Sequence, residues 1–270
     1  MAIVLASIHI YPVKSLGGIS LPAAQITARG LRHDRRFMLI DADHEFITQR
    51  EVPQMATIRT AIKGDELILT SAFGDSVSVP LEPRPMPTRT VRVWASQVQA
   101  HIVSAGADEW LSNHLGVDAR LVYMPDSAER RVSPEYAQND EIVSFADGYP
   151  LLVVSEASLT DLNARIVRNG GDAVTMDRFR ANLVVSGCAP FAEDAWGEFR
   201  IGEAVFRGVK PCTRCQITTT DQTTGEARGA EPLRTLATFR DSPVGVRFGM
   251  NLLAVNLGHI RVRDAIVVSQ

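Results

Sequence analysis

The stretch GDELILTSAFGDSVSVPLEPRPMP, residues 64–87, decides the class of fold. Its opening Gly-Asp turn signal precedes a strand pattern at residues 66–70, and residues 76–79 alternate between polar and apolar side chains. Pro80 then opens a run of four prolines in eight residues. Such a run resists both helix and central strand, because proline cannot donate a backbone hydrogen bond. We therefore predict short strands, followed by a junction between two domains at about residue 88.

The rest of the chain repeats this pattern of short strands with turn residues between them. Further strand patterns occupy residues 3–10, 36–40, 90–94, 183–185 and 260–268. Helical patterns are limited to residues 107–115, to a segment that a capping box at Ser158 would start, and to a short stretch after Pro232. This balance predicts a strand-dominated α+β fold, with a barrel or sandwich rather than a doubly wound parallel sheet.

The composition is that of a globular protein that needs no disulfide to hold its core. The 270 residues are 45% hydrophobic, and 28 basic against 31 acidic residues give a net charge of −3. This charge argues against sequence-independent nucleic-acid binding. We expect neither a secretory leader nor a membrane span, because no leader pattern and no run of 18 apolar residues occurs. The three cysteines are too few for a disulfide framework, which favours a cytoplasmic location.

The strongest local motif is KPCTRC, residues 210–215. Its lysine and arginine place positive charge near both sulfurs and favour the thiolate, which is the form that reacts and binds metals. Three interpretations stay open. The pair is half of a zinc site, although Cys188 is the one other cysteine and no His-x₃₋₅-His pair completes four ligands. It is a dithiol redox pair, although residues 216–220 are strand-like rather than helical. Or one thiolate binds a heavier metal carried by an organic cofactor.

Other motifs offer groups for an anion or a heterocycle. Lys14 and Ser15 end a YPVKS motif and DRRF occupies residues 34–37, so lysine, hydroxyl and arginine donors are available for a phosphate. Asp147 lies in a turn, FADGYP, from which it could accept hydrogen bonds from a heterocycle. Gly249, in the stretch FGMN, would let the backbone approach a ligand closely.

Taken in order, these motifs resemble one family. YPVKS, DRRF, FADGYP, SEASL, RFRANLVVSG and KPCTRC follow one another as in the molybdenum cofactor sulfurase C-terminal (MOSC) domain family, from residue 8 to about residue 267. The branch that the chain resembles most includes the mitochondrial amidoxime-reducing component and its bacterial relatives. The resemblance implies a β-barrel-like MOSC domain over residues 89–270, with a core at about 120–268. It also implies a smaller β-rich MOSC N domain over residues 1–88, packed with the first.

The resemblance further implies which residues bind the molybdenum cofactor. Cys215 matches the family's molybdenum ligand and is the expected catalytic and metal-binding residue. Residues that match the pterin and phosphate contacts are Lys14, Ser15, Arg36 and Arg180. Other positions that match cofactor-lining residues are Asp147, Gly148, Tyr149, Asn182, Thr213, Arg214 and Asn251. Some relatives have a tyrosine at the position of Asn251.

The implied activity is the reduction of N-hydroxylated compounds, such as amidoximes, hydroxylamines and N-hydroxylated bases. The cofactor would be Mo-molybdopterin rather than pyridoxal phosphate. Some bacterial relatives carry a C-terminal iron–sulfur domain, but this sequence has no cysteine after Cys215. We therefore expect electrons from a separate protein of the ferredoxin, cytochrome b5 or flavin-reductase type, with no nucleic-acid or membrane partner. Two alternatives stay open: a cofactor or sulfur carrier without turnover, and a zinc or dithiol redox protein that uses Cys212 and Cys215.

Overall fold

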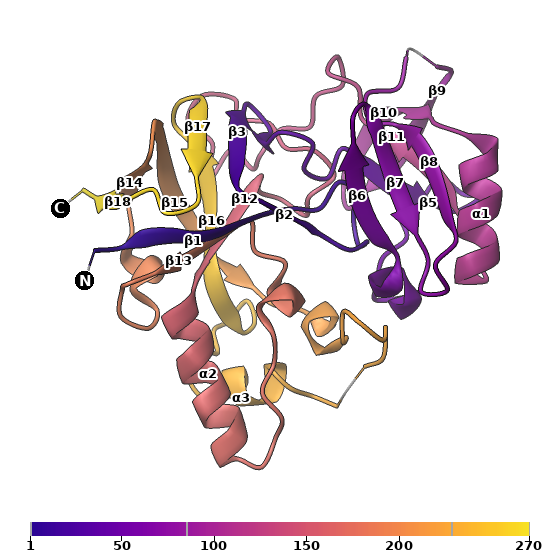
Figure 1. Ribbon diagram of the computed structural model, residues 1–270. Coiled ribbons are helices and arrows are strands. Elements are labelled where there is room, and N and C mark those ends of the chain that lie inside the picture. Colours follow the sequence, from indigo (N-terminus) through magenta and orange to yellow (C-terminus); the bar gives the residue numbers. More distant parts are fainter. Residues whose placement is uncertain (1, 85, 228, 270) are drawn as a thin grey trace.

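The computed structural model describes residues 2–84, 86–227 and 229–269. Within these ranges strands dominate and three α-helices occur, which confirms the predicted strand-rich α+β class. Figure 1 shows the strands in two groups, one around β15 and β16 and the other beside α1. Two helices, α2 and α3, lie below the first group.

The first group is an eight-stranded sheet with the order β18-β14-β15-β16-β12-β13-β1-β2. Its strands are β1 (Val4–Ile10), β2 (Ile19–Leu21), β12 (Leu151–Ser155), β13 (Leu183–Ser186), β14 (Glu198–Ile201), β15 (Ala204–Thr213), β16 (Arg247–Ala254) and β18 (Ile266–Val268). Neighbouring strands are antiparallel except β12 and β13. These two are parallel because the connection between them, which contains α2 (Glu156–Arg168), returns the chain to the end of the sheet where β12 began.

The large sheet curls until its edge at β18 meets β1. The Ile266 amide donates to the Ile3 carbonyl at 2.8 Å, and the Leu5 amide donates to the Asp264 carbonyl at 3.0 Å. Apolar side chains from the facing strands, with Phe199 and Phe206 among them, fill the interior. The curled sheet is therefore barrel-like, with a packed core rather than an open lumen.

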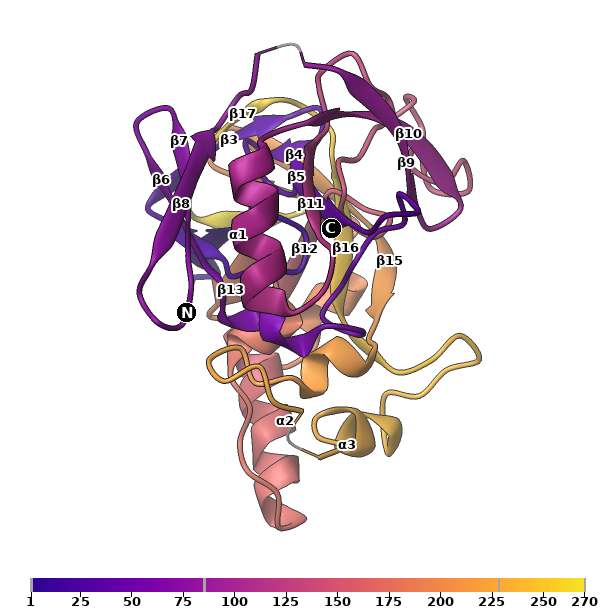
Figure 2. The same cartoon turned by 90° about the vertical axis from the view of Figure 1, so that its right-hand side faces the viewer.

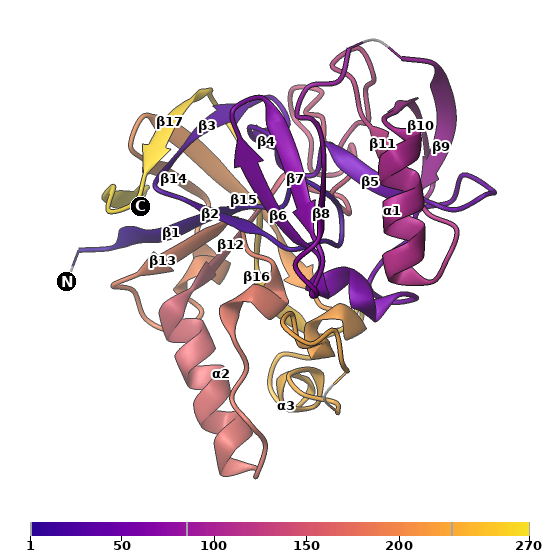
Figure 3. The ribbon, with the colours of Figure 1, turned by 45° about the vertical axis from the view of Figure 1, so that its right-hand side comes forward.

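Helices cover part of the outside of this sheet. The apolar side of α2 packs, with α3 (Leu233–Ala237), against β12 and β13, where Leu162 and Ile166 are fully buried. Figure 3 shows α2 extending below the sheet with α3 beside it. This helical layer covers the outer face of β12 and β13.

The second group combines strands from both sides of the proline run. A sheet with the order β5-β11-β10-β9 contains β5 (Phe37–Ile40), β9 (Thr88–Val93), β10 (Ser96–Ile102) and β11 (Arg120–Tyr123). A small sheet contains β6 (Arg59–Lys63), β7 (Glu66–Thr70) and β8 (Ser76–Pro80). In Figure 2, α1 (Ala105–Leu115) stands between this small sheet and the β9–β10 hairpin. The proline run thus joins strands of two different sheets, and a domain boundary at residue 88 stays a prediction.

A third small sheet joins distant parts of the chain. It has the order β17-β3-β4 and contains β3 (Ala23–Thr27), β4 (Gly30–Leu31) and β17 (Gly258–Arg261). Near the middle of the β3–β17 ladder, Ala24 is paired with Ile260. The N-terminal and C-terminal segments are therefore parts of one folded unit.

The start of α2 corrects the capping box predicted at Ser158. The N-cap is Ser155, whose hydroxyl accepts a hydrogen bond from the Ser158 amide at 3.0 Å. The Ser158 hydroxyl donates instead to the carboxylate of Glu193 at 2.7 Å. The capping-box prediction was wrong because this buried glutamate, which lies far along the chain, provides an acceptor that local spacing does not reveal. The other two predicted helices are present as α1 and α3.

No helix within residues 2–84, 86–227 and 229–269 has both the length and the apolar character needed to cross a membrane. No three side chains of His, Cys, Asp or Glu there lie close enough together to share a metal ion.

Gly208 tests the packing at the middle of β15. A Cβ at this position would lie 2.2 Å from the carbonyl oxygen of Trp196. We expect Gly208→Ala to lower the free energy of unfolding by about 1–3 kcal/mol, because overpacking forces the neighbouring backbone to move. Urea denaturation measures this. Gly197→Ala is the matched control, since nothing lies within 4 Å of its Cβ. Equal losses in the two variants would contradict the packing described for β15.

Candidate functional site

A cavity of about 480 Å³ lies where the end of β15 meets the loops of the N-terminal half. It contains every site residue predicted from the sequence except Arg36. Those residues are Lys14, Ser15, Asp147, Gly148, Tyr149, Arg180, Asn182, Thr213, Arg214, Cys215 and Asn251. Other polar residues in the lining are Arg35, Thr48, Arg50, Trp94, Lys210 and Cys212.

β15 brings the KPCTRC motif to the cavity wall. Its ladder with β16 shifts register between Pro211 and Thr213, and the Arg214 amide donates to the Val246 carbonyl at 2.8 Å. Cys215 then precedes a 3₁₀ turn, Gln216–Thr219, where the sequence predicts a strand.

That strand prediction is wrong for a local reason. The Thr218 hydroxyl donates to the Cys215 carbonyl at 2.9 Å, and the Thr219 hydroxyl donates to the Gln216 carbonyl at 2.7 Å. Such side-chain bonds to nearby backbone compete with a strand ladder. The β-branched residues therefore stabilise a turn that holds Cys215 at the cavity.

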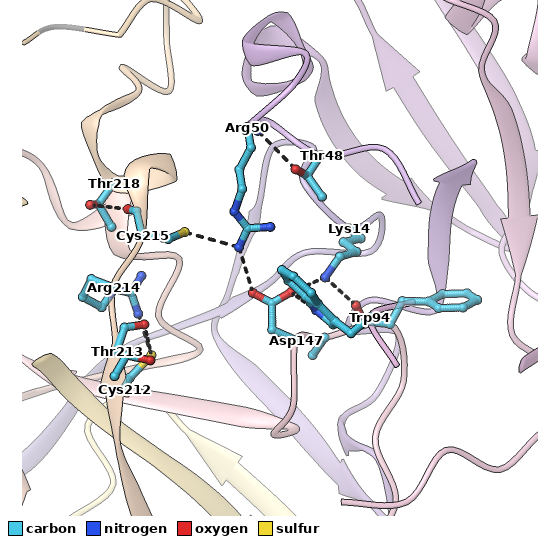
Figure 4. Close-up of polar contacts among 12 residues, drawn as sticks. Lys14, Thr48, Arg50, Trp94, Asp147, Cys212, Thr213, Arg214, Cys215 and Thr218 are labelled. Atoms are coloured by element: carbon cyan, nitrogen blue, oxygen red, sulfur yellow. Dashed lines mark hydrogen bonds and ion pairs between the residues drawn. The ribbon is translucent and has the colours of Figure 1, made fainter. Parts of the chain in front are cut away.

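Cys215 faces Arg50, a residue that no sequence motif indicated. Arg50 Nη2 lies 3.4 Å from Cys215 Sγ and 3.9 Å from Asp147 Oδ2. Figure 4 shows the Arg50 side chain between these two residues. The centre of the same guanidinium is 4.7 Å from the centre of the Trp94 ring. Cys212 has a different partner, because Arg214 Nη1 donates to its sulfur at 2.9 Å.

Lys14 and Asp147 form an ion pair next to Arg50 (Figure 4). The Lys14 side chain is 7% exposed and also donates to the Phe145 carbonyl at 3.0 Å. Trp94 Nε1 donates to Asp147 Oδ1 at 3.1 Å. The loss of water at the cavity wall would by itself raise the pKa of the Asp147 carboxyl. The charges of Lys14 and Arg50 and the hydrogen bonds from Lys14 and Trp94 instead hold this pKa well below its usual range.

The loop that carries Asp147 is held from behind by Arg130. This arginine is buried and donates to the Ser144 carbonyl at 3.0 Å and to the Asp147 carbonyl at 2.7 Å. It also donates to the Ala146 carbonyl. Arg130 therefore fixes the backbone on both sides of the Asp147 side chain without lining the cavity itself.

A second cluster of positive charge surrounds Tyr11. The guanidinium carbons of Arg35 and Arg180 lie 4.5 and 4.2 Å from the centre of its ring. Arg180 Nη1 donates to the Leu16 carbonyl at 2.7 Å, but its Nη2 is buried and has no hydrogen-bond partner among the described residues. Burial and the nearby charge of Arg35 lower the pKa of Arg180 to about 10, so the group stays charged at neutral pH. This unpaired donor is available to a bound anion.

Several residues of the lining have unusual backbone conformations. Ser15, Arg35, Trp94 and Arg180 have positive φ angles of 66°, 48°, 55° and 53°. This left-handed region is unfavourable for residues other than glycine and costs of order 1–3 kcal/mol where the surroundings impose it. Strain of this kind gathers at functional sites, and here it occurs at two arginines and at Trp94, all of which line one cavity.

Arg36 and Gly249 lie elsewhere than the sequence suggested. Arg36 donates to the Met124 carbonyl and pairs with Asp126 at 2.8 Å, outside the cavity. It is the preceding residue of the same DRRF motif, Arg35, that lines the cavity. The prediction that Gly249 lets the backbone approach a ligand is wrong, because a Cβ there would lie 2.7 Å from a methyl group of Val154. Gly249 is needed for the close approach of β16 to β12.

Some of the cavity residues that were not predicted from the sequence lie inside the quoted motifs, and others lie outside them. Arg35 and Lys210 lie inside motifs that were quoted for their charge. Arg50 and Trp94 lie in ordinary stretches, TQRE and VRVWA, and carried no signal. They reach the site because the turn after β5 and the tip of the β9–β10 hairpin fold toward β15.

Comparison with known families agrees with these motifs. The MOSC N-terminal beta barrel domain matches residues 2–118, and the MOSC domain matches residues 140–267. The chain belongs to the MOSC family. The resemblance that the ordered motifs indicated is thereby confirmed.

Relatives of this MOSC protein include amidoxime-reducing components and a molybdenum cofactor sulfurase. Mitochondrial amidoxime-reducing component 1 of Mus musculus is 34% identical to it, over 97% of this chain and 81% of the relative. The human protein of the same name is 32% identical, over 97% of this chain and 82% of the relative. Molybdenum cofactor sulfurase of Oryza sativa is 33% identical over 92% of this chain, which corresponds to 32% of that longer protein.

Asp147 allows a test of the charge balance in the MOSC site. We expect Asp147→Asn to lower the free energy of unfolding at pH 7 by about 1–3 kcal/mol, because it takes the carboxylate from the buried Lys14 ammonium. Folding lowers the pKa of Asp147. The difference in free energy of unfolding between wild type and Asp147→Asn is therefore complete above the unfolded-state pKa of about 4, and it is lost as the pH falls toward the folded-state pKa.

Chemical denaturation at a series of pH values between neutrality and acid checks this dependence. Asp126→Asn is the control, because the side chain of Asp126 is 90% exposed and its pair with Arg36 lies outside the cavity. A wild-type advantage over Asp147→Asn that does not shrink in acid would contradict the assigned ionisation.

Proposed function

We propose that this MOSC protein binds the molybdenum cofactor and reduces N-hydroxylated compounds with electrons from a separate donor protein. One observation carries the proposal: the cavity brings the Cys215 thiol together with six basic side chains and a single carboxylate. The basic residues are Lys14, Arg35, Arg50, Arg180, Lys210 and Arg214. The names of the amidoxime-reducing relatives support this choice of reaction.

The donor set fits a group that has an anionic tail, a polar heterocycle and a soft metal. Arg180 Nη2 and Arg214 Nε are buried without hydrogen-bond partners among the described residues, which suits the oxygens of a phosphate or other acceptors. Asp147, held ionised by Lys14, could accept from the amino edge of a pterin. Cys215 supplies the one thiolate that a metal needs when the pterin supplies further sulfurs.

The reaction removes oxygen from nitrogen. An amidoxime, two electrons and two protons give the amidine and water, so the N–O bond breaks and the oxygen leaves in the water. When bound, the cofactor supplies a metal that takes up the electrons and reacts with the oxygen. The chain's own residues bind and orient: Cys215 holds the metal, and the basic groups around Tyr11 hold the anionic tail.

The remaining features of the proposal concern partners and place. The substrates are small N-hydroxylated molecules, and the donor is a one-electron protein of the ferredoxin, cytochrome b5 or flavin-reductase type. We propose a cytoplasmic location.

A second candidate is a carrier of the cofactor or of sulfur without turnover. The likeness to molybdenum cofactor sulfurase favours it. A carrier would bind molybdenum and pterin through the same residues but would not reduce a substrate with any donor. Metal analysis and a turnover assay on the same sample therefore separate the two candidates.

Cys215→Ala tests the assigned ligand. The variant is produced in a host that makes molybdopterin, and benzamidoxime reduction is measured with a flavin-reductase donor system. We expect the rate to fall at least about 100-fold, because loss of a metal ligand should cost more than loss of a residue that only supports a ligand. Molybdenum per chain, measured by mass spectrometry, should fall as well. Cys212→Ala is the matched control and should keep most of both values, because its thiol pairs with Arg214. Unchanged turnover in Cys215→Ala would refute the assignment.

A further inference from the structure

Hydrogen bonds of the Arg50 backbone hold this residue at the cavity. Its amide donates to Thr48 Oγ1 at 3.1 Å, and its carbonyl accepts a hydrogen bond from Gln216 Nε2 at 3.3 Å. Gln216 directly follows Cys215, so the backbone of Arg50 is tied to the segment that carries the thiol.

The neighbouring residue strengthens this attachment. Gln49 is 1% exposed and donates to the Ser15 carbonyl at 2.7 Å. It also exchanges two amide hydrogen bonds with Gln222, at 3.1 and 3.0 Å. Residues 48–50 are therefore fixed to both halves of the chain around the cavity, and the position of the Arg50 guanidinium is determined before any ligand binds.

The guanidinium of Arg50 retains donors for a ligand. An arginine side chain has five N–H donors. The protein contacts described above use Nη2, whereas Nη1 and Nε of Arg50 have no hydrogen-bond partner among residues 2–84, 86–227 and 229–269. The side chain is 21% exposed and lines the cavity, with the Trp94 ring beside it. Unused donors thus lie beside the Cys215 sulfur.

Three other cations of the cavity have protein partners away from the Cys215 sulfur. Lys14 pairs with Asp147, and Arg214 donates to the Cys212 sulfur and, at 2.7 Å, to the Phe179 carbonyl. Arg35 donates to Asp34 at 2.7 Å and lies in the cluster at Tyr11. Arg50 is therefore the cation that the structure assigns to the sulfur of Cys215.

We propose that Arg50 binds the oxygen of the substrate's N–OH group beside Cys215, as a catalytic residue. The inference rests on the function proposed above and deepens it. Breaking the N–O bond places negative charge on the departing oxygen, and a fixed guanidinium stabilises such charge without giving up a proton. The two protons come from water, the two electrons come from the donor protein, and the oxygen leaves as water.

The first experiment needs neither metal nor turnover. Cofactor-free protein with Cys188→Ser and Cys212→Ser keeps one thiol, and the rate constants for its alkylation by iodoacetate and by iodoacetamide are measured. Both reagents attack the same thiolate, so the ratio of the two rates is independent of the thiolate fraction. It reports the attraction of a negative oxygen-bearing group to the neighbourhood of the sulfur.

We expect Arg50→Met to lower the iodoacetate/iodoacetamide ratio about fivefold, the effect of one unit charge at about 4 Å in water. Arg50→Lys should retain part of the ratio, because it keeps the charge but loses the planar fork. Arg92→Met is the matched control, since Arg92 is 55% exposed and pairs with Glu45 on the surface. A ratio that is the same in Arg50→Met as in the parent overturns the inference.

The second experiment uses the metal-loaded enzyme. We expect the kcat of Arg50→Met for benzamidoxime, calculated per bound molybdenum, to fall about 100-fold, with partial recovery in Arg50→Lys. A kcat per molybdenum within threefold of wild type in Arg50→Met overturns the inference. If Arg50→Met lowers the alkylation ratio of the single-thiol protein but molybdenum-loaded wild-type protein reduces no N-hydroxylated compound, the proposed function is refuted and Arg50 is an anion-binding group at Cys215.

Discussion

Six basic side chains line one cavity in this MOSC protein, and they repel one another. The surrounding structure must stabilise these charges for the protein to fold. Backbone carbonyls accept hydrogen bonds from at least three of the six. Lys14 donates to the carbonyl of Phe145, Arg180 to that of Leu16 and Arg214 to that of Phe179. Carbonyl dipoles stabilise each cation without cancelling its charge, and Asp147 is the single carboxylate in the lining. The cavity thus keeps a net positive charge that an anionic ligand would neutralise.

This arrangement has an energetic consequence for the protein without a ligand. Burial, and after it the nearby charge of Arg35, lower the pKa of Arg180, which means that folding disfavours the charged form of that side chain. The left-handed backbone at Ser15, Arg35 and Trp94 adds strain at the same place. A ligand that binds the folded state alone relieves the repulsion and adds stability according to its concentration and affinity. Such a ligand would therefore offset the part of the folded state's stability that is lost to this repulsion.

Much of the site could be predicted from the sequence, because motif residues such as Lys14, Asp147 and Cys215 occur in a recognisable order. Which of Arg35 and Arg36 lines the cavity could not be predicted in this way. Adjacent residues point in different directions, and Arg35 has a left-handed backbone that turns it toward the cavity while Arg36 reaches Asp126. Arg50 was invisible for another reason: its partner Cys215 lies 165 residues away, and nothing local marks such a contact.

The fold shows the same division between local and distant information. A strand pattern after a turn signal predicted β7 correctly, and alternating residues predicted β8, because each strand has one face on a core. The start of α2 was predicted wrongly, because Glu193 takes the Ser158 hydroxyl. Tertiary partners overrode local preference there.

The interleaving of the two halves bears on how the site forms. β1 belongs to the curled sheet and leads directly into Lys14 and Ser15, whereas Arg50 and Trp94 follow from the strands beside α1. Because the β3–β17 ladder and the bond between Leu5 and Asp264 also join the chain's two ends, neither half has a complete set of cavity walls. The thiol, its guanidinium partner and the anion-binding cluster come together when both parts are folded. Unfolding of either part should therefore remove the site at once, which couples ligand binding to the cooperativity of the whole chain.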